Sequence, residues 1–197
     1  ATAQDDVSVG QVWLPWFTLA ALFWFTAAPA WLLFGWAPQQ RALVAATGIL
    51  VLVPTWLAMV ALRELSPYTL LLVMALVWVA DSVAYFVGRR YGKHKLAPAI
   101  SPGKTWEGVL GGFAGVAIYL MLAVLAVIAT RNYGEQLPLP LFVVVVLGAP
   151  LTVASIIGDL FESWMKRQVG LKDSGSLLPG HGGVWDRIDA LTATLPV

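Results

Sequence analysis

The chain has 197 residues, of which 59% are hydrophobic and only 12% are charged, and its formal net charge is +1. Soluble domains are about 45–50% apolar and about 25% charged, so this composition excludes an ordinary soluble globule and indicates a polytopic membrane protein. A net charge this small gives no basis for nucleic-acid binding, and the absence of cysteine excludes disulfides and thiolate chemistry.

Long apolar stretches follow one another along the chain, and a spanning helix needs about 20 such residues. We predict spans at 12–36, 42–62, 67–88, 107–130 and 141–165, and the first half of a sixth at 184–197. Proline removes a helix hydrogen bond, so Pro29 is expected to kink the first span. The predicted fold is all-α, a polytopic transmembrane helical bundle that forms a single membrane-embedded domain over 1–197 and carries catalytic loops on its cytoplasmic face. Because the chain starts without methionine and stops in an apolar run, we expect it to be truncated at both ends.

Basic residues concentrate in two of the predicted loops, 89–106 and 166–187. Two spans separate these loops, so both fall on one face of the membrane, and the positive-inside tendency makes that face cytoplasmic. The loop between them, 131–140, carries one Arg and one Glu and suits the opposite face. Counting back along the spans places the amino terminus outside.

Glycines recur at small-xxx-small spacing in the fourth span, at Gly108, Gly111, Gly112 and Gly115. This spacing is typical of close helix–helix packing, either within the chain or at a dimer interface. Glycine is also frequent in membrane helices generally, and the two interpretations stay open.

Acidic residues lie within or beside the apolar stretches, where an Asp at mid-helix costs about 2.5–3.5 kcal/mol to insert. Asp81 lies in the third span, Asp159 lies in the fifth with Glu162 and Ser163 on the same face, and Asp186 and Asp189 open the last. Clustered carboxylates need neutralisation, and a carboxylate site suits Mg²⁺. The alternatives are a structural hydrogen bond for Asp81 and simple ion pairs for the others, such as Asp186 with Arg187.

Two loop segments supply candidate phosphate ligands. In the first, Ser101, Lys104 and Thr105 precede a predicted helix amino terminus, which favours an anion site; the spacing is not that of a Walker A loop. In the second, His181 stands between Gly180 and the pair Gly182 and Gly183, so the backbone can approach a ligand closely. A lone His is more often structural than catalytic, but its position between glycines and two acids leads us to expect a catalytic-site role for His181. Zinc is disfavoured because the chain has two histidines and no cysteine.

Two long runs of the sequence resemble the phosphatidate cytidylyltransferases (CDP-diacylglycerol synthases). The segment ADSVAYFVGRRYGKHKLAPAISPGKTWEG is similar to one characteristic block of that family, and the residues from Ser163 to Asp189 are similar to its signature. With the intervening spans, the resemblance covers about 57–197. It implies a polytopic helical enzyme of the bacterial inner membrane, commonly a homodimer, that condenses CTP with the membrane lipid phosphatidate and forms CDP-diacylglycerol and pyrophosphate.

From this resemblance we expect particular roles for the candidate residues. Asp159 and Asp186 would hold Mg²⁺, with Asp189 and Asp81 supporting it or a second cation, which the resemblance suggests is K⁺. Ser163 and Lys104 would contact a substrate phosphate, and the remaining cationic residues would neutralise the triphosphate and the lipid phosphate: Lys166, Arg167, Lys172 and Arg187.

Two other functions remain open at this point. A CTP-dependent polyprenol or lipid kinase would transfer the γ-phosphate and release CDP. An ion or phosphate transporter would also carry intramembrane acids, but the sequence shows no duplicated pattern of the kind that inverted-repeat transporters have. The glycine-rich run from Gly180 to Asp189 favours the cytidylyltransferase.

Overall fold

The computed structural model describes residues 3–36, 40–131, 141–171, 173–175, 183 and 185–197. Within these residues, five helical segments are long and apolar enough to cross a membrane: Trp13–Phe34, Arg41–Leu65, Pro67–Tyr91, Trp106–Ala129 and Val146–Gln168. The prediction of a helical membrane bundle is thereby confirmed, and these segments agree with the five full spans expected from the sequence to within five residues at each end.

The first span is a continuous helix whose middle turn is irregular. It consists of α1 (Ala3–Leu22), a π-helical turn η1 (Phe23–Ala27) and α2 (Ala28–Phe34). Pro29 lies at the start of α2, so the missing proline N–H and the bulk of its ring are accommodated by the wider turn that precedes it. Gly35 ends α2 in the left-handed conformation with φ of 61°, which glycine adopts without strain.

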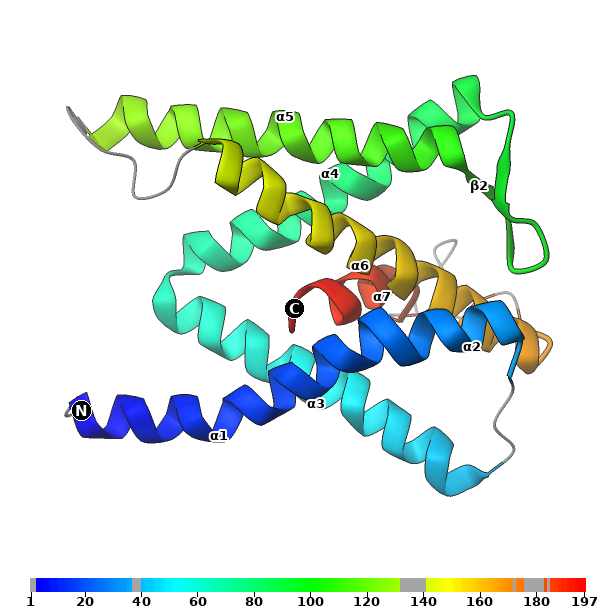
Figure 1. Cartoon of the computed structure of the whole chain (residues 1–197), viewed down its shortest axis with the longest axis horizontal. Coiled ribbons are helices and arrows are strands. Elements are labelled where there is room, and N and C mark those ends of the chain that lie inside the picture. Colours follow the sequence, from blue (N-terminus) through cyan, green and yellow to red (C-terminus); the bar gives the residue numbers. More distant parts are fainter. Residues whose placement is uncertain (1–2, 37–39, 132–140, 172, 176–182, 184) are drawn as a thin grey trace.

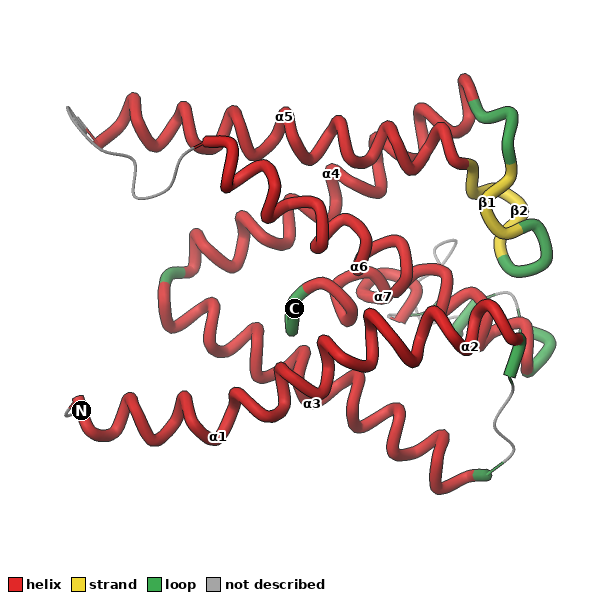
Figure 2. Tube along the Cα trace, viewed as in Figure 1, coloured by secondary structure: helices red, strands yellow, loops and turns green. Residues whose placement is uncertain are grey.

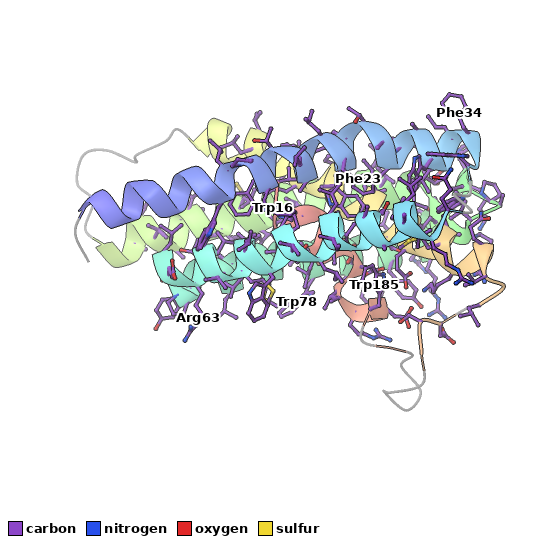
Figure 3. All side chains as sticks on the ribbon, turned by 90° about the horizontal axis from the view of Figure 1, so that it is seen from below. Trp16, Phe23, Phe34, Arg63, Trp78 and Trp185 are labelled. Atoms are coloured by element: carbon purple, nitrogen blue, oxygen red, sulfur yellow. The ribbon has the colours of Figure 1, made fainter. Side chains whose placement is uncertain are left out.

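The remaining helices run back and forth between two ends of the bundle. They are α3 (Arg41–Leu65), α4 (Pro67–Tyr91), α5 (Trp106–Arg131), α6 (Leu141–Gln168) and α7 (Trp185–Thr194). Figure 1 shows the ends of α2, α4 and α6 and the start of α5 at one end, and the amino terminus and the α3–α4 junction at the other. In Figure 3, Phe34 and Arg63 mark these opposite ends. The described residues that begin the two basic loops, after α4 and after α6, therefore lie at one end, as predicted.

The sixth predicted span corresponds to the short helix α7, which has 10 residues. Its residues Ala190 to Thr194 are buried, and α7 packs against α6, α3 and α4. In Figure 1 it lies between the longer helices rather than along the outside of the bundle. This placement is what brings its acidic residues beside those of the other helices.

A small antiparallel hairpin interrupts the all-α architecture between α4 and α5 (Figure 2). Strand β1 (Lys95–Ala97) pairs with β2 (Ser101–Thr105), with Lys95 opposite Thr105 and Ala97 opposite Ser101. The sequence prediction placed a loop here. The base of the hairpin is fixed to the start of α5, because the Trp106 N–H donates to the His94 carbonyl at 3.0 Å and the His94 Nδ1 lies 2.6 Å from Glu107 Oε1.

The glycines of α5 pack against α4 of the same chain. A Cβ added to Gly108 would lie 2.8 Å from the Ala84 carbonyl oxygen, and one added to Gly115 would lie 2.8 Å from a methyl carbon of Val83. Since real side chains do not approach so closely, only glycine lets these two helices meet. The predicted close helix packing is confirmed, and it is used within the chain.

The main core lies between the first span and α6 and is strongly aromatic. Trp24 and Phe161 are each 1% exposed, and their rings meet edge to face at 5.6 Å between centroids. Phe161 also stacks on Trp164, which is buried. Tryptophan is typical of membrane interfaces, but these residues serve instead to hold α6, and hence its carboxylates, against η1.

Candidate active site

Three aspartates from three helices act on one another electrostatically. They are Asp81 of α4, Asp159 of α6 and Asp189 of α7, and we call them the aspartate cluster. Burial, and then the charges of Asp159 and Asp81, raise the pKa of Asp189 to about 7. Asp81 and Asp159 repel each other as well. The sequence predicted one site for these acids, and in the structure their charges act on one another.

The hairpin contributes the basic partner of this cluster. Lys104 of β2 places its Nζ 2.6 Å from Asp159 Oδ2, and the same Nζ lies 3.5 Å from the Ile156 carbonyl oxygen. Hydroxyl groups of α6 complete the surroundings: Ser155 Oγ donates to Asp81 Oδ1 at 3.2 Å and Ser163 Oγ to Asp159 Oδ1 at 3.5 Å. Among the contacts of the described residues, Lys104 is therefore the ammonium paired with this cluster, through Asp159.

A second group of charges lies beside the first, and we call it the Lys166 cluster. Lys166 Nζ is 2.6 Å from Glu162 Oε2 and 2.7 Å from Asp186 Oδ1. Glu162 is 3% exposed, and its other oxygen, Oε1, is buried without a hydrogen-bond partner. The charge of Asp189 also acts on Glu162, so the two clusters are electrostatic neighbours.

Asp186, in the first turn of α7, accepts hydrogen bonds from residues that precede the helix. Its carboxylate accepts hydrogen bonds from the Ser174 N–H and Oγ, both at 2.9 Å, and from the Gly183 N–H at 2.7 Å. Burial alone would raise the pKa of Asp186, but the hydrogen bonds from Lys166 and from the Gly183 and Ser174 N–H groups outweigh it and hold that pKa below its usual range. The sequence predicted one site with four acids. In the structure the charges of Asp81, Asp159 and Asp189 act on one another, and Asp186 is paired with Lys166 in the neighbouring cluster.

A close approach of two helices holds the aspartate cluster in place. Gly158 of α6 lies against α7, where an added Cβ would be 2.7 Å from Ala193 Cβ and 2.9 Å from the Asp189 carbonyl oxygen. Because Gly158 directly precedes Asp159, the absence of a side chain there sets the spacing between Asp159 and Asp189.

The other predicted site residues have varied surroundings. Thr105 is buried, and its hydroxyl caps α5 by accepting the Gly108 N–H at 3.1 Å. Ser101 is half-buried at the start of β2, and Arg167 is exposed with its guanidinium 3.3 Å from the Leu171 carbonyl oxygen. Arg187 is exposed on α7. Lys172, His181 and Gly182 lie outside the described residues.

The sequence analysis missed two pairs that the structure shows. Glu162 and Lys166 are four residues apart on α6, the spacing at which helix side chains meet, so this pair was readable from the sequence. Glu162 had been placed with Asp159 instead. The contact between His94 and Glu107 joins residues on either side of the hairpin, and no local sequence pattern predicts it.

The donor types of the aspartate cluster, though not their present spacing, suit a hard divalent cation. Its donors are carboxylate oxygens joined by serine hydroxyls, as Mg²⁺ prefers, and their mutual repulsion is what a bound cation would relieve. No three acidic or histidine side chains are gathered closely enough to form a ligand set in the part of the chain that the structure describes.

Comparison with known proteins bears on what this arrangement does. The family model for the cytidylyltransferase family matches residues 6–197. The chain belongs to the cytidylyltransferase family. Both acidic clusters and the hairpin lie inside the matched region.

Among relatives in the family are proteins named phosphatidate cytidylyltransferase. The one from Pseudomonas aeruginosa is 46% identical over 188 residues, which cover 91% of this chain and 66% of the relative. Those from Haemophilus influenzae and Bacillus subtilis are 48% and 41% identical over 131 and 140 residues, covering 66% and 70% of this chain. The chain spans 66%, 43% and 49% of these three relatives, respectively.

Proposed function

We propose that this chain carries the catalytic helices of a phosphatidate cytidylyltransferase, which transfers CMP from CTP to phosphatidate and forms CDP-diacylglycerol and pyrophosphate. The proposal rests mainly on one observation. The aspartate cluster, with Lys104, lies beside the Lys166 cluster, and both are at one end of a bundle of apolar helices. A reaction between a water-soluble nucleotide and a lipid phosphate needs charged groups at such a boundary. The names of the relatives point to the same reaction.

The proposed step is a single displacement at phosphorus. An oxygen of the phosphatidate phosphate attacks the α-phosphorus of CTP, a P–O bond forms, and the bond from the α-phosphorus to the bridging oxygen of the β-phosphate breaks. Pyrophosphate leaves with that electron pair. Catalysis of this kind consists mainly of positioning and of stabilising negative charge. No covalent enzyme intermediate is required, because phosphatidate supplies the nucleophile.

The residues of this chain divide that work between the two clusters. Asp81, Asp159 and Asp189 would draw closer together to hold Mg²⁺, with K⁺ as a second cation, and Asp186 would hold Ser174 and Gly183 at the start of α7. When bound, Mg²⁺ supplies positive charge to the phosphate oxygens. The Lys104 ammonium lies 2.6 Å from the Asp159 carboxylate, so it would be within reach of a phosphate bound to a cation at that carboxylate. Lys166 and Arg167 stand at the end of α6, where they can neutralise the lipid phosphate.

The setting of the site belongs to the same proposal. The end of the bundle that carries the hairpin and the basic loops would face the cytoplasm, following the positive-inside tendency, with the helices in the bacterial inner membrane. A homodimer would have to use a surface other than the glycine face of α5, since that face packs on α4.

Labelled CTP tests the reaction directly on the full-length protein in phosphatidate-containing vesicles with Mg²⁺. Label at the α-phosphorus should appear in the lipid, and label at the γ-phosphorus should appear in pyrophosphate. Transfer of the γ-label to lipid would instead establish a lipid kinase. Uptake of ions or phosphate into vesicles without CTP turnover would establish a transporter.

A further inference from the structure

An apolar cavity of about 470 Å³ lies between α2, α3 and α6, at the end of the bundle that carries the catalytic groups. Its walls are Trp31 of α2, Val44 and Val51 of α3, and Phe161, Trp164 and Val169 of α6. This volume is within the range of about 300–1,000 Å³ typical of small-molecule sites. The cavity follows the helices within the apolar spans, so its ligand is expected to be a hydrocarbon.

One end of this cavity is polar and continuous with the site described above. Glu162, Lys166 and Ser174 line it, and all three belong to the Lys166 cluster or its loop. Lys166 therefore faces the cavity while its ammonium contacts Asp186 at 2.7 Å. A molecule in the cavity would have its apolar part among aromatic and aliphatic side chains and its polar end at the catalytic groups.

We propose that this cavity holds one acyl chain of the phosphatidate substrate and thereby places the lipid phosphate at Lys166. The inference rests on the proposed function and adds to it the place of the lipid. Away from its polar end, the apolar walls of the cavity disfavour the nucleotide as occupant, because a cytosine ring and a ribose would lose hydrogen bonds to water there. An acyl chain loses none, and each buried methylene favours binding.

Gly48 gives a way to fill the cavity without disturbing the fold. It lines the cavity from α3, and an added Cβ would meet no atom within 4 Å. Gly48→Leu therefore projects a side chain into the space proposed for the lipid, and it replaces a poor helix former with a good one. Ala45→Leu is the matched control, since Ala45 is exposed on the same helix and does not line the cavity.

In full-length protein, Gly48→Leu should raise the KM for long-chain phosphatidate by about tenfold, the equivalent of about two buried methylene groups. The KM for CTP should not change, and dioctanoyl phosphatidate, with its shorter chains, should be affected less. Ala45→Leu should behave as wild type. An unchanged KM for long-chain phosphatidate in folded Gly48→Leu protein would overturn the proposal.

Cross-linking tests the cavity independently of turnover. Phosphatidate with a diazirine on one acyl chain should label residues 44–51 and 161–169 in the wild type, and Gly48→Leu should remove that labelling. If these segments are labelled but no CMP is transferred, the proposed function fails while the lipid site stands. If CMP is transferred but the label falls on other segments, the site fails while the function stands.

Discussion

The two charged clusters of this molecule lie side by side but are neutralised in opposite ways. In the Lys166 cluster, one ammonium lies between two carboxylates, and Asp186 receives further hydrogen bonds from Ser174 and Gly183. In the aspartate cluster, three carboxylates share Lys104, which contacts Asp159 alone among them. The pKa of Asp186 is lowered, while that of Asp189 is raised to about 7.

This difference separates a structural role from a ligand-binding one. Asp186 obtains its stabilising partners from the protein, so its main effect is to hold Ser174 and Gly183 against the start of α7. The aspartates of the other cluster accept hydrogen bonds as well, from Ser155, Ser163 and the Ala190 N–H, but their charges repel one another, so further positive charge would stabilise them together. A substitution in the aspartate cluster should therefore affect chemistry more than stability, and one in the Lys166 cluster should affect both.

The largest effect is expected from Asp159→Asn. This substitution removes the carboxylate that pairs with Lys104 and interacts electrostatically with Asp81 and Asp189. CMP transfer should fall by about 10²- to 10³-fold, the cost typical of losing one group that stabilises transition-state charge. Mg²⁺ should raise the thermal unfolding midpoint of the wild type and leave that of the variant unchanged. Glu64→Gln, an exposed carboxylate at the opposite end of the bundle, is the control and should keep full activity. Equal activity in both variants would contradict the assignment of the aspartate cluster.

Removal of Lys166 should be the largest change in stability. Lys166→Met leaves Glu162 and Asp186 unpaired in partly buried positions, and breaking such a pair costs about 3 kcal/mol. The double variant Glu162→Gln, Lys166→Met removes one of the unpaired charges and should recover part of that loss without recovering activity. Denaturation in detergent and CMP transfer measure the two effects. Recovery of activity in the double variant would show that Lys166 has only a structural role.

A methyl group at Gly158 should disturb the aspartate cluster by way of α7. Gly158→Ala places a Cβ against Ala193 and the Asp189 carbonyl, so we expect a loss of about 1–3 kcal/mol in stability and up to about 100-fold in activity as Asp189 shifts. Gly148→Ala is the matched control on the same helix. Its Cβ would meet the ends of Leu120 and Val116, away from the aspartates. Activity per folded molecule should fall in Gly158→Ala alone, and a parallel fall in both would refute the spacing role.

The smallest effect is expected at the exposed contact between His94 and Glu107. His94→Ala frees one edge of the hairpin that carries Lys104, so the KM for CTP should rise by no more than a few-fold, with kcat nearly unchanged. Lys104→Ala in the same assay should reduce kcat as well. A larger effect from His94 than from Lys104 would show that the hairpin, rather than its ammonium, is what the reaction needs.

Much of this fold was predictable from the sequence because hydropathy is a strong local signal. Spans of about 20 apolar residues, the spacing of Gly108, Gly111 and Gly115, and the location of both basic loops at one end follow from it. The hairpin was not predictable. Residues 95–105 contain Pro98, Pro102 and Gly103, which read as a loop, and the strands are held by contacts with α5 that no local pattern encodes.

The sequence indicated which acidic residues belong to a site more reliably than it indicated which of them contact one another. Carboxylates in apolar helices are costly, so Asp81 and Asp159 stood out as partners in some site. Which acids share a base depends on helix rotation and on close approaches such as that at Gly158, and these are set by packing. For this reason Asp186, three residues from Asp189, was predicted to be its companion and is bound to Lys166 instead.

We propose that Asp81, Asp159 and Asp189 together bind the cation to which the nucleotide binds. Anomalous scattering from crystals of the full-length protein with Mn²⁺ and CTP tests it most directly. We expect a Mn²⁺ peak between these three carboxylates and in contact with the triphosphate. A peak bound by Asp186 without the three aspartates, or a triphosphate bound with no metal beside them, would contradict it.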